Sequence, residues 1–330
     1  MKENPLTKYF VFSDVHGEYD ALINSLRMAG YEGGNPQHKL ISLGDAFDRG
    51  PNSREVYEYL KTERAICIKG NHDVMFQQYL EEGMKHRHVL FNILHNGLGA
   101  TIRSFTGLNE TIYSVDQLDR ARRDVPYSVL PWLQKLPLYF ETASFIFCHA
   151  GIHPQLENWK DTDEHFMLWD IEHSDEKCLF TNKIIVIGHH HAQRVREIAN
   201  NKGIKEVELN RSTYNPKNCD NRKHFLYYGN TDDNRPYKNG NKIAVDGMTN
   251  LTGKVNVLVI EDYPVEGRYV KDDIDEAVEE INPELKATNG YYQVSYNNDN
   301  LYQWVSSTGV FTANDFFNDA TVTMANTTTL

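Results

Sequence analysis

Two aspartates, an arginine and a glycine stand close together in the segment ISLGDAFDRGPNS, residues 41–53. Asp45 and Asp48 lie three residues apart, directly after an apolar run, and Arg49 follows at once. Carboxylates are ligands for divalent metal ions, and the planar guanidinium of arginine pairs with phosphate oxygens. A single loop of this kind is as often a capped polar turn as a site, so its interpretation depends on the rest of the chain.

Other potential metal ligands also follow apolar runs directly. They are oxygen and imidazole donors without a thiolate: Asp14, His16, Asp45, Asn71, His149 and His189. Such donors suit Mn, Fe, Zn, Ni or similar divalent ions better than a structural zinc–thiolate site. Asp14 and His16 are one residue apart, so on an extended strand both side chains would point to the same side and could share one metal.

The spacing of these donors favours two metal ions. Asp45 has two carboxylate oxygens and can bridge two ions, while Asn71 adds a neutral amide oxygen that limits the negative charge facing a phosphate. Two ions about 3.5–4 Å apart can bind a phosphoryl group and activate a water molecule between them. The sequence therefore predicts a cofactor of two divalent metal ions, with manganese the first candidate.

The elements that must position these residues are short strands alternating with helices. The apolar runs predict strands at 9–12, 39–43, 65–68, 145–148 and 184–187, with a hairpin at 242–262 around Gly253. Helical spacing predicts helices over 20–29, 53–60 and 74–83 and a mostly helical region over 84–142. This alternation predicts an α/β fold, a layered β-sandwich flanked by helices, with ligands at the carboxyl ends of the strands.

Composition divides the chain into a catalytic domain and an extension. Residues 1–264 contain the predicted strands and all the candidate metal ligands, so we expect them to form the catalytic domain. Within this domain, residues 196–241, approximately, are polar and asparagine-rich, which predicts an insertion. Residues 265–330 begin acidic and become rich in asparagine and threonine, so we expect a C-terminal extension outside the motifs.

Net charge, hydropathy and cysteine spacing argue against several classes of protein. A net charge of −12 over 330 residues argues against a general nucleic-acid or membrane-surface binder. No apolar run approaches the length of a membrane span, and the N-terminus lacks the apolar region of a signal peptide. The four cysteines show no CxxC spacing, which predicts reduced thiols in a cytoplasmic protein.

Five motifs in order resemble those of the calcineurin-like metallophosphoesterase superfamily. They are DVHG at 14–17, GDAFDRG at 44–50, GNHD at 70–73, HAG at 149–151 and GH at 188–189. The GDxxDRG and GNH forms are typical of its phosphoprotein phosphatase branch, in particular of phage and bacterial members. That group includes the lambda-phage phosphatase and the symmetrical diadenosine tetraphosphate hydrolases. HNGLGAT and LPWLQKLPL are also similar to segments of this branch, and the likeness spans roughly residues 8–262.

The resemblance implies a role for each matching residue. Asp14 and His16 would bind the first metal, Asp45 would bridge, and Asn71, His149 and His189 would bind the second. Arg49 would bind the substrate phosphate beside Asn71. His72 would protonate the leaving oxygen as a general acid, and Asp48 would orient its ring and stabilise its charge.

Three departures from the pattern of the branch affect the expected site. Asp73 replaces the usual glutamate after GNH. Many relatives carry a second phosphate-binding arginine after a Leu-Trp pair, but Asp170 follows Trp169 here, which leaves Arg194, Arg196 or Arg211 as substitutes. The run GHHH at 188–191 fits the GHxH form of the wider superfamily. By that resemblance His191 would be a seventh metal ligand; the alternative is that its side chain is solvated or supports the ligands without binding metal.

The resemblance implies a phosphoesterase that hydrolyses phosphate monoesters by attack of a metal-bound hydroxide. A serine/threonine protein phosphatase is the first expectation, with a phosphorylated protein or a small phosphoester as substrate. The alternatives are a dinucleoside polyphosphate hydrolase or a nucleotide or RNA-end phosphatase. An inactive binding module on the same fold is the alternative of another class.

Overall fold

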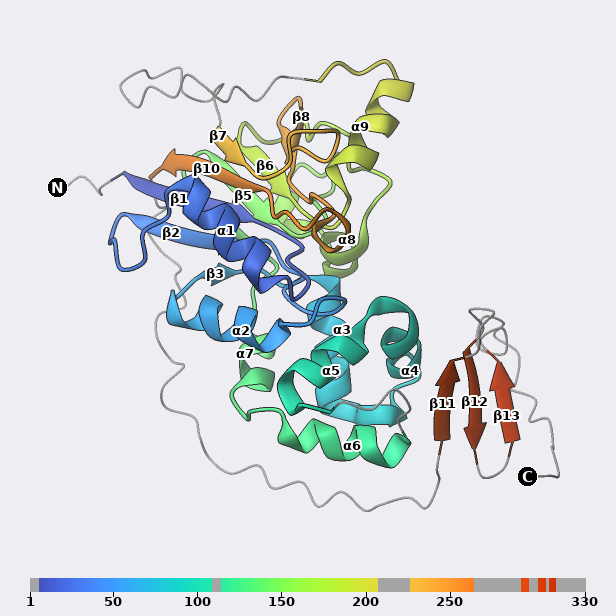
Figure 1. Cartoon of the computed structure of the whole chain (residues 1–330). Coiled ribbons are helices and arrows are strands. Elements are labelled where there is room, and N and C mark those ends of the chain that lie inside the picture. The colour runs from blue at the N-terminus through green and yellow to red at the C-terminus, as the bar shows by residue number, and fades with distance from the viewer. Residues whose placement is uncertain are drawn as a thin grey trace.

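A computed structural model describes residues 6–108, 114–206, 226–263, 292–296, 302–306 and 309–312 of the chain. Two five-stranded mixed sheets form its centre, in the strand orders β3-β2-β1-β10-β7 and β4-β5-β6-β9-β8 (Figure 1). The first sheet contains β1 (Thr7–Phe12), β2 (His38–Ser42), β3 (Ile66–Cys67), β7 (Leu226–Tyr228) and β10 (Val257–Asp262). The second contains β4 (Tyr139–Glu141), β5 (Phe145–Cys148), β6 (Ile184–Ile187), β8 (Tyr237–Asn239) and β9 (Lys242–Ala244).

The two sheets pack face to face, because alternate side chains of each strand enter a shared core. In β1, Tyr9 and Val11 belong to the core between the sheets, whereas Phe10 and Phe12 belong to the core on the helical side. The strand β6 divides in the same way between the inner core and the outer face of the second sheet. Strands buried on both faces are continuously apolar, which is why periodicity of two is hidden in these runs.

Helices cover both outer faces of this sandwich. The helices α1 (Tyr19–Ala29) and α2 (Ser53–Thr62) bury apolar residues on the outer side of the first sheet. The helix α9 (Ala192–Asn201) packs with the outer side of the second sheet. The predicted α/β sandwich flanked by helices is therefore confirmed.

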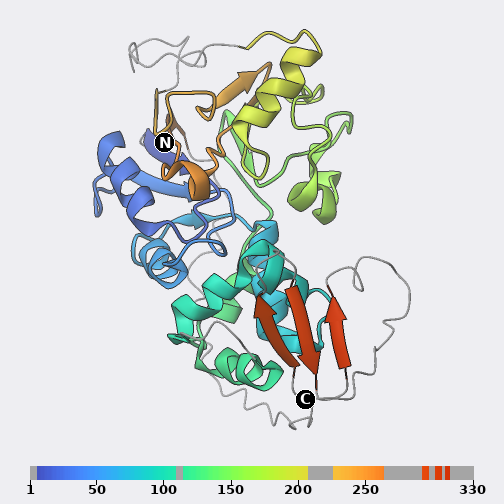
Figure 2. The same cartoon turned by 45° about the vertical axis from the view of Figure 1, so that its right-hand side comes forward.

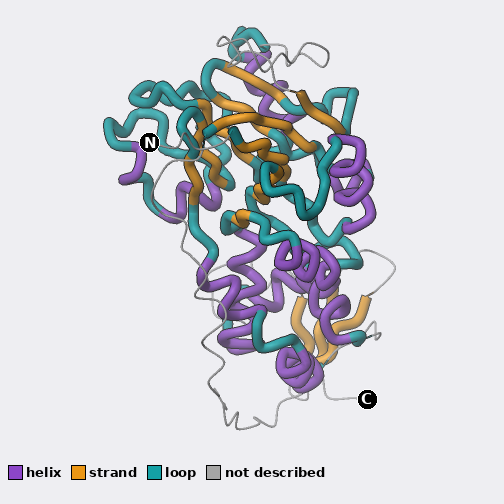
Figure 3. The backbone as a smooth tube through the Cα atoms, turned by 90° about the vertical axis from the view of Figure 1, so that its left-hand side faces the viewer, coloured by secondary structure: helices purple, strands orange, loops and turns teal. Residues whose placement is uncertain are grey.

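A helical region lies between β3 and β4 and extends away from the sheets (Figures 2 and 3). It contains α3 (Asn71–Glu82), η1 (Gly83–Lys85), α4 (Val89–Phe91), the π-helix η2 (Asn92–Asn96), α5 (Leu98–Thr106), α6 (Val115–Asp124) and α7 (Val129–Lys135). Aromatic rings join it to the loop after β2: Phe47 lies within 6.0 Å, centroid to centroid, of Phe76, Phe105 and Trp132. The mostly helical character predicted for 84–142 is confirmed, apart from residues 109–113, which lie outside the described ranges.

Two expectations about the elements are wrong. Residues 242–262 are not a hairpin, because β9 pairs with β6 and β8 whereas β10 pairs with β1 and β7 in the other sheet. The short helix α10 (Thr249–Thr252) ends at Gly253 and carries the chain from one sheet to the other. The helix α3 begins at Asn71 rather than 74, so Asn71 and His72 lie in its first turn.

The remaining elements are η3 (Trp159–Asp161) and α8 (Glu164–Trp169) between β5 and β6, and three strands near the C-terminus. The strands β11 (Tyr292–Tyr296), β12 (Tyr302–Ser306) and β13 (Gly309–Thr312) form a separate antiparallel sheet. The range predicted as an insertion, 196–241, includes most of α9 together with β7 and β8, and its residues 207–225 lie outside the described part. The division at residue 264 stays a prediction.

Candidate metal-binding active site

All six predicted metal ligands come together at the carboxyl ends of five strands. Asp14 and His16 follow β1, Asp45 follows β2, Asn71 follows β3, His149 follows β5, and His189 follows β6. A hydrogen bond between the loops after β1 and β6 joins the two sheets at this point, because the His189 N–H donates to the Asp14 carboxylate oxygen Oδ2 over 2.9 Å. The site thus lies at one end of the sandwich, where motifs that are far apart in the sequence meet.

Four donor atoms surround one point on the side of the second sheet. Asn71 Oδ1 lies 2.8 Å from His149 Nε2 and 3.1 Å from His189 Nδ1. Asp45 Oδ1 lies 3.4 Å from the same Nε2 of His149. These are the residues expected to hold the second metal, with Asp45 as the bridge.

The hydrogen bonding of His149 shows that this group of donors fits a cation. Its Nδ1–H donates to the Leu43 carbonyl over 2.7 Å, which leaves Nε2 of the neutral ring as an acceptor. That acceptor faces the amide oxygen of Asn71, another acceptor, at hydrogen-bond distance. Burial lowers the pKa of His149, and burial together with His149 lowers the pKa of His189 to about 2, so protonation does not supply the missing hydrogen. A metal ion would satisfy both lone pairs.

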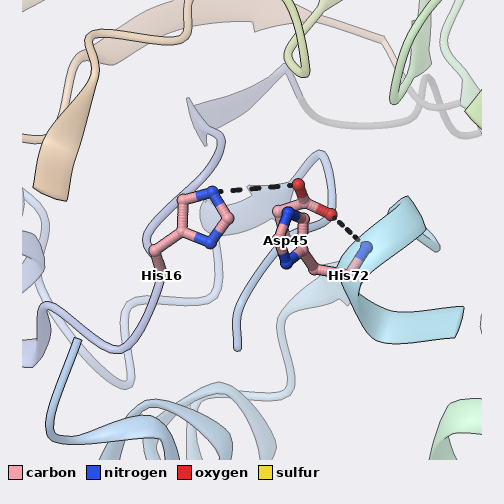
Figure 4. A group of neighbouring side chains, drawn as sticks. All are labelled: His16, Asp45 and His72. Carbon is pink, nitrogen blue, oxygen red and sulfur yellow. Dashed lines mark hydrogen bonds and ion pairs between the residues drawn. The ribbon is translucent and has the colours of Figure 1, made fainter. Parts of the chain in front are cut away.

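A second set of donors lies on the other side of Asp45 (Figure 4). The His16 Nδ1–H donates to the Phe47 carbonyl over 2.8 Å, and its Nε2 lies 3.9 Å from both Asp14 Oδ1 and Asp45 Oδ2. Asp45 therefore directs one oxygen toward each set of donors, as a bridging carboxylate must. Burial, and next the charge of Asp14, raises the pKa of Asp45, so the ionised carboxylate is disfavoured there. Cations between these carboxylates would offset that penalty.

His72 is close enough to the first set to be considered a ligand. Among the described residues, donor atoms of His16, Asp45 and His72 lie within 4.8 Å of one another, as do those of Asp45, His149 and His189. Figure 4 shows that the contact drawn between His72 and Asp45 uses the backbone nitrogen, which donates to Oδ1 over 2.9 Å. The ring of His72 forms its other contacts with Asp48 and Arg49.

The backbone at the first motif differs from the extended strand that was expected. The strand β1 ends at Phe12, and Asp14 and His16 have positive φ angles of 52° and 49°. The turn is held by the second motif, because the His16 N–H donates to the Asp45 carbonyl over 3.0 Å. Six site residues share this left-handed conformation among the described part of the chain: Asp14, His16, Asp45, Asp48, Arg49 and His189.

Asp48, Arg49 and His72 form one hydrogen-bond network beside the donors. The His72 ring donates from Nδ1 to Asp48 Oδ2 over 2.7 Å. The exposed Arg49 places Nη2 at 3.1 Å from His72 Nε2 and Nη1 at 2.8 Å from His16 Nε2. The geometry therefore joins the predicted phosphate ligand, the predicted acid and a predicted metal ligand.

The segment HNGLGAT, residues 95–101, supports this network directly. The Gly97 carbonyl accepts the Arg49 N–H over 3.1 Å, and a Cβ on Gly97 would clash with that nitrogen. Thr101 accepts the Asp48 N–H over 2.7 Å and donates to Asp48 Oδ1 over 2.8 Å. The resemblance of this segment to the same branch was the signal that could have pointed to it.

Asp73 is a second supporting residue whose role was not predicted. Its buried carboxylate accepts N–H groups from Gly70 at 2.7 Å, Asp45 at 3.1 Å and Ala46 at 3.3 Å. Burial raises its pKa to about 7 despite these hydrogen bonds. Asp73 thereby fixes the backbone on both sides of the bridging carboxylate, and the position after GNH was the available signal.

His191, Arg194 and Arg196 each contact an acidic side chain outside the two sets of donors. His191 places Nε2 3.6 Å from Oδ2 of the buried Asp246, and it belongs to neither donor group. The Arg196 guanidinium binds Glu206 and three backbone carbonyls, so it is occupied within the fold. Arg194 is exposed and pairs with Glu197, and Arg211 lies outside the described residues.

Other features of the described chain agree with the composition. Cys67, Cys148 and Cys178 are free and buried, as expected of reduced thiols, and Cys219 lies outside the described ranges. Among the described helices, none has both the length and the apolar character that crossing a bilayer requires. A cytoplasmic location stays a prediction.

Comparisons with known proteins find one family over most of the chain. The family described as "Calcineurin-like phosphoesterase" matches residues 7–220. The bis(5′-nucleosyl)-tetraphosphatase PrpE [asymmetrical] of Bacillus velezensis is 29% identical over 157 residues, which cover 44% of this chain and 56% of that protein. Serine/threonine-protein phosphatase 2 of Escherichia coli is 37% identical over 75 residues, 22% of this chain and 33% of that protein.

One solved structure that the chain matches is the cold-active protein-tyrosine phosphatase of a psychrophilic Shewanella species. It is 16% identical, with a TM-score of 0.43 over 78% of this chain and 76% of that one. The chain spans about half the length of the curated tetraphosphatases that it matches.

Proposed function

The chain belongs to the calcineurin-like phosphoesterase family, and from this premise we propose that it hydrolyses phosphoesters at a site for two divalent metal ions. Asp14, His16 and Asp45 would hold the first ion. Asp45, Asn71, His149 and His189 would hold the second. Bound ions would supply Lewis acidity and a water molecule of lowered pKa at neutral pH. Manganese fits this oxygen and imidazole set, as do iron, zinc and nickel.

The position of Arg49 is the observation that carries the proposal. Its guanidinium donates to His16 Nε2 and to His72 Nε2, so it stands beside a proposed metal ligand and the proposed acid, and a bound first metal would take the His16 lone pair in place of Arg49. It is exposed, whereas the residues around it are buried, so a substrate phosphate can reach it from solvent. A planar guanidinium binds two phosphate oxygens at once and fixes the orientation of the ester. Asn71 lies in the adjoining turn and would contact the same phosphate.

His72 has the position required of a general acid. Its Nε2 is directed toward Arg49, and hence toward the proposed place of the phosphate, while Nδ1 is held by Asp48. In the structure Nε2 accepts a hydrogen bond from Arg49. With Arg49 turned to the substrate phosphate, Nε2 would carry a proton and transfer it to the leaving oxygen. Asp48 fixes the ring orientation and stabilises its positive charge, as a carboxylate does for other catalytic imidazoles.

For the substrate we favour a dinucleoside polyphosphate, in which water would attack one phosphorus atom, a phosphoanhydride bond would break, and the leaving group would be the phosphate oxygen of a nucleotide. The tetraphosphatase relatives align over 44% to 53% of the chain, whereas the protein phosphatase relative aligns over 22%. The lack of the arginine that many relatives carry after the Leu-Trp pair also leaves room for a substrate other than a phosphoprotein. A serine/threonine phosphoprotein is the second candidate, favoured by GDAFDRG and by the higher identity of that shorter match.

A substrate panel tests the proposal. The Mn(II)-loaded protein is given diadenosine tetraphosphate, a phosphoserine peptide, a cyclic nucleotide and a 5′-phosphorylated RNA. We expect kcat/KM to be highest for diadenosine tetraphosphate. A higher value for the phosphopeptide would select the second candidate. Retained metal without turnover of any phosphoester would identify an inactive binding module and contradict the proposal.

A further inference from the structure

A tryptophan lies at the rim of the candidate site and has no part in the chemistry described above. Trp169 is the last residue of α8, and 36% of its surface is exposed although it is a large apolar residue. Its ring meets the ring of His189 edge to face, with centroids 6.4 Å apart and an angle of 82°. Trp169 therefore adjoins a proposed metal ligand and solvent at once.

A second ring extends this exposed surface. His165 lies one helical turn before Trp169 and is also exposed, and the two rings are nearly parallel at 24° with centroids 6.4 Å apart. Residues four apart on a helix share one face. We call Trp169 and His165 the aromatic platform.

The aromatic platform is held in place by the residues between its members. Met167 and Leu168 are buried, with exposures of 2% and 3%, and the Met167 carbonyl accepts the Ala150 N–H over 2.8 Å. Ala150 directly follows the proposed ligand His149. The platform is thus anchored to the same strand end as the second set of donors, and its distance from them is fixed by packing.

The side chain of the next residue, Asp170, is directed to a partner outside the platform. Asp170 stands where many relatives carry an arginine, but its carboxylate accepts His173 Nδ1–H over 2.8 Å and the His173 N–H over 3.2 Å. It is therefore directed toward His173. At this edge of the site the chain offers an aromatic face in place of a cationic one.

We propose that the aromatic platform stacks the nucleobase of a nucleotide substrate whose phosphate binds at the metal site. The inference rests on the proposed function and names its specificity residue. Every nucleobase presents a π-face to an aromatic side chain, so stacking gives affinity without selecting one base. A nucleoside carries its base one ribose away from the 5′-phosphate, which suits neighbouring binding groups. A phosphoserine side chain has no ring to offer this surface.

Steady-state kinetics on two substrates test the platform. Trp169→Ala is compared with wild type on diadenosine tetraphosphate and on inorganic tripolyphosphate, which has no base. Losing one base stack should raise KM for the dinucleotide by about 5- to 150-fold. The loss on tripolyphosphate should be at least several-fold smaller. Trp169→Phe should recover most of the dinucleotide affinity, and Ile171→Ala, an exposed apolar change two residues away, serves as the matched control.

The same comparison separates stacking from support of His189. Equal losses on both substrates, or loss of metal from Trp169→Ala, would assign Trp169 a structural role and overturn the proposal. If Trp169→Ala raised KM for a phosphotyrosine peptide as much as for diadenosine tetraphosphate, the assignment to nucleobases would be overturned. The platform would then bind a phenol ring as well as it binds a base.

Binding without turnover distinguishes a failure here from a failure of the proposed function. AMP should quench tryptophan fluorescence in the metal-loaded His72→Asn variant, and the quenching should disappear when Trp169→Phe is added. Trp159→Phe, a change at a ring that packs on Tyr139, should leave the quenching in place. Quenching that survives Trp169→Phe overturns the platform even if hydrolysis is found. Quenching that depends on Trp169 supports it even if no tested phosphoester is hydrolysed.

Discussion

The Nδ1 atom of His72 lies 2.7 Å from Oδ2 of Asp48, and both side chains are shielded from solvent, with residue exposures of 3% and 0%. Thr101 binds the other carboxylate oxygen of Asp48 at 2.8 Å. The carboxylate therefore has little freedom, and the imidazole is fixed with Nε2 toward Arg49. Such a pair is suited to proton donation, and its role can be separated from metal binding.

The replacement His72→Asn should slow hydrolysis most where the leaving group needs a proton. General acid catalysis contributes about 10²–10⁴-fold, so a loss of that order is expected for an alkoxide leaving group such as serine. On p-nitrophenyl phosphate, whose phenolate leaves with little help, the loss should be much smaller. The measurement is the ratio of the two rate losses at saturating Mn(II), with metal content as the control.

Asp48→Asn should show the same selectivity in weaker form, because Asp48 acts through the ring. Equal losses on both substrates, or departure of a metal ion from His72→Asn, would reassign His72 to a structural or ligand role. The proximity of its ring to His16 and Asp45 makes that outcome a real alternative.

Removing metal should abolish activity, because the facing acceptors of Asn71 and His149 need a cation between them. We expect dialysis against chelator to give inactive protein and Mn(II) to restore turnover. Elemental analysis of the restored protein should approach two ions per chain. Full activity retained in excess chelator would refute the proposed dinuclear site.

Arg49→Ala should weaken phosphate binding while both metal ions stay bound. A charge-assisted hydrogen bond contributes roughly 1.5–3 kcal/mol, so the inhibition constant of inorganic phosphate should rise by about 10- to 100-fold. Arg49→Lys should recover only part, since an ammonium cannot form the two-pronged contact. An unchanged inhibition constant would place the phosphate ligand elsewhere.

Asp73→Ala should destabilise the protein and the bridging position together. It leaves three buried N–H groups without their acceptor, each at a cost of about 1–3 kcal/mol, so we expect a loss of about 3 kcal/mol or more in the free energy of unfolding. Asp73→Asn keeps one acceptor oxygen and should lose less. Urea unfolding and Mn(II) titration provide the measurements. A small loss in both variants would show that water replaces the carboxylate.

Truncation near Gly267 should leave both metal ions bound, because the proposed ligands all precede it. Tm should fall by no more than about 4 °C if the removed segment lies outside the cooperative core. Altered substrate preference with intact metal content would indicate that the extension reaches the active site. Simultaneous loss of metal and cooperative unfolding would show that the boundary at 264 is misplaced.

The sequence predicted the strands and the residue types at their ends, because buried strands leave continuous apolar runs and the motifs follow them directly. It could not predict which sheet each late strand joins. The segment around Gly253 has the form of a turn, but pairing partners far along the chain decide that β9 and β10 separate. Likewise, the supports from Thr101 and Asp73 depend on contacts between helices and loops that local periodicity does not record.

The left-handed backbone at six of the site residues sets a limit on how this centre can be engineered. Left-handed φ values are tolerated by glycine, asparagine, aspartate and histidine but are strained for β-branched side chains. Saturation libraries at Asp14, Asp45 or His189 would therefore be depleted of folded members in a way that reflects the main chain and not the chemistry. Transplanting the motif letters onto another strand end would likewise fail unless the turn came with them.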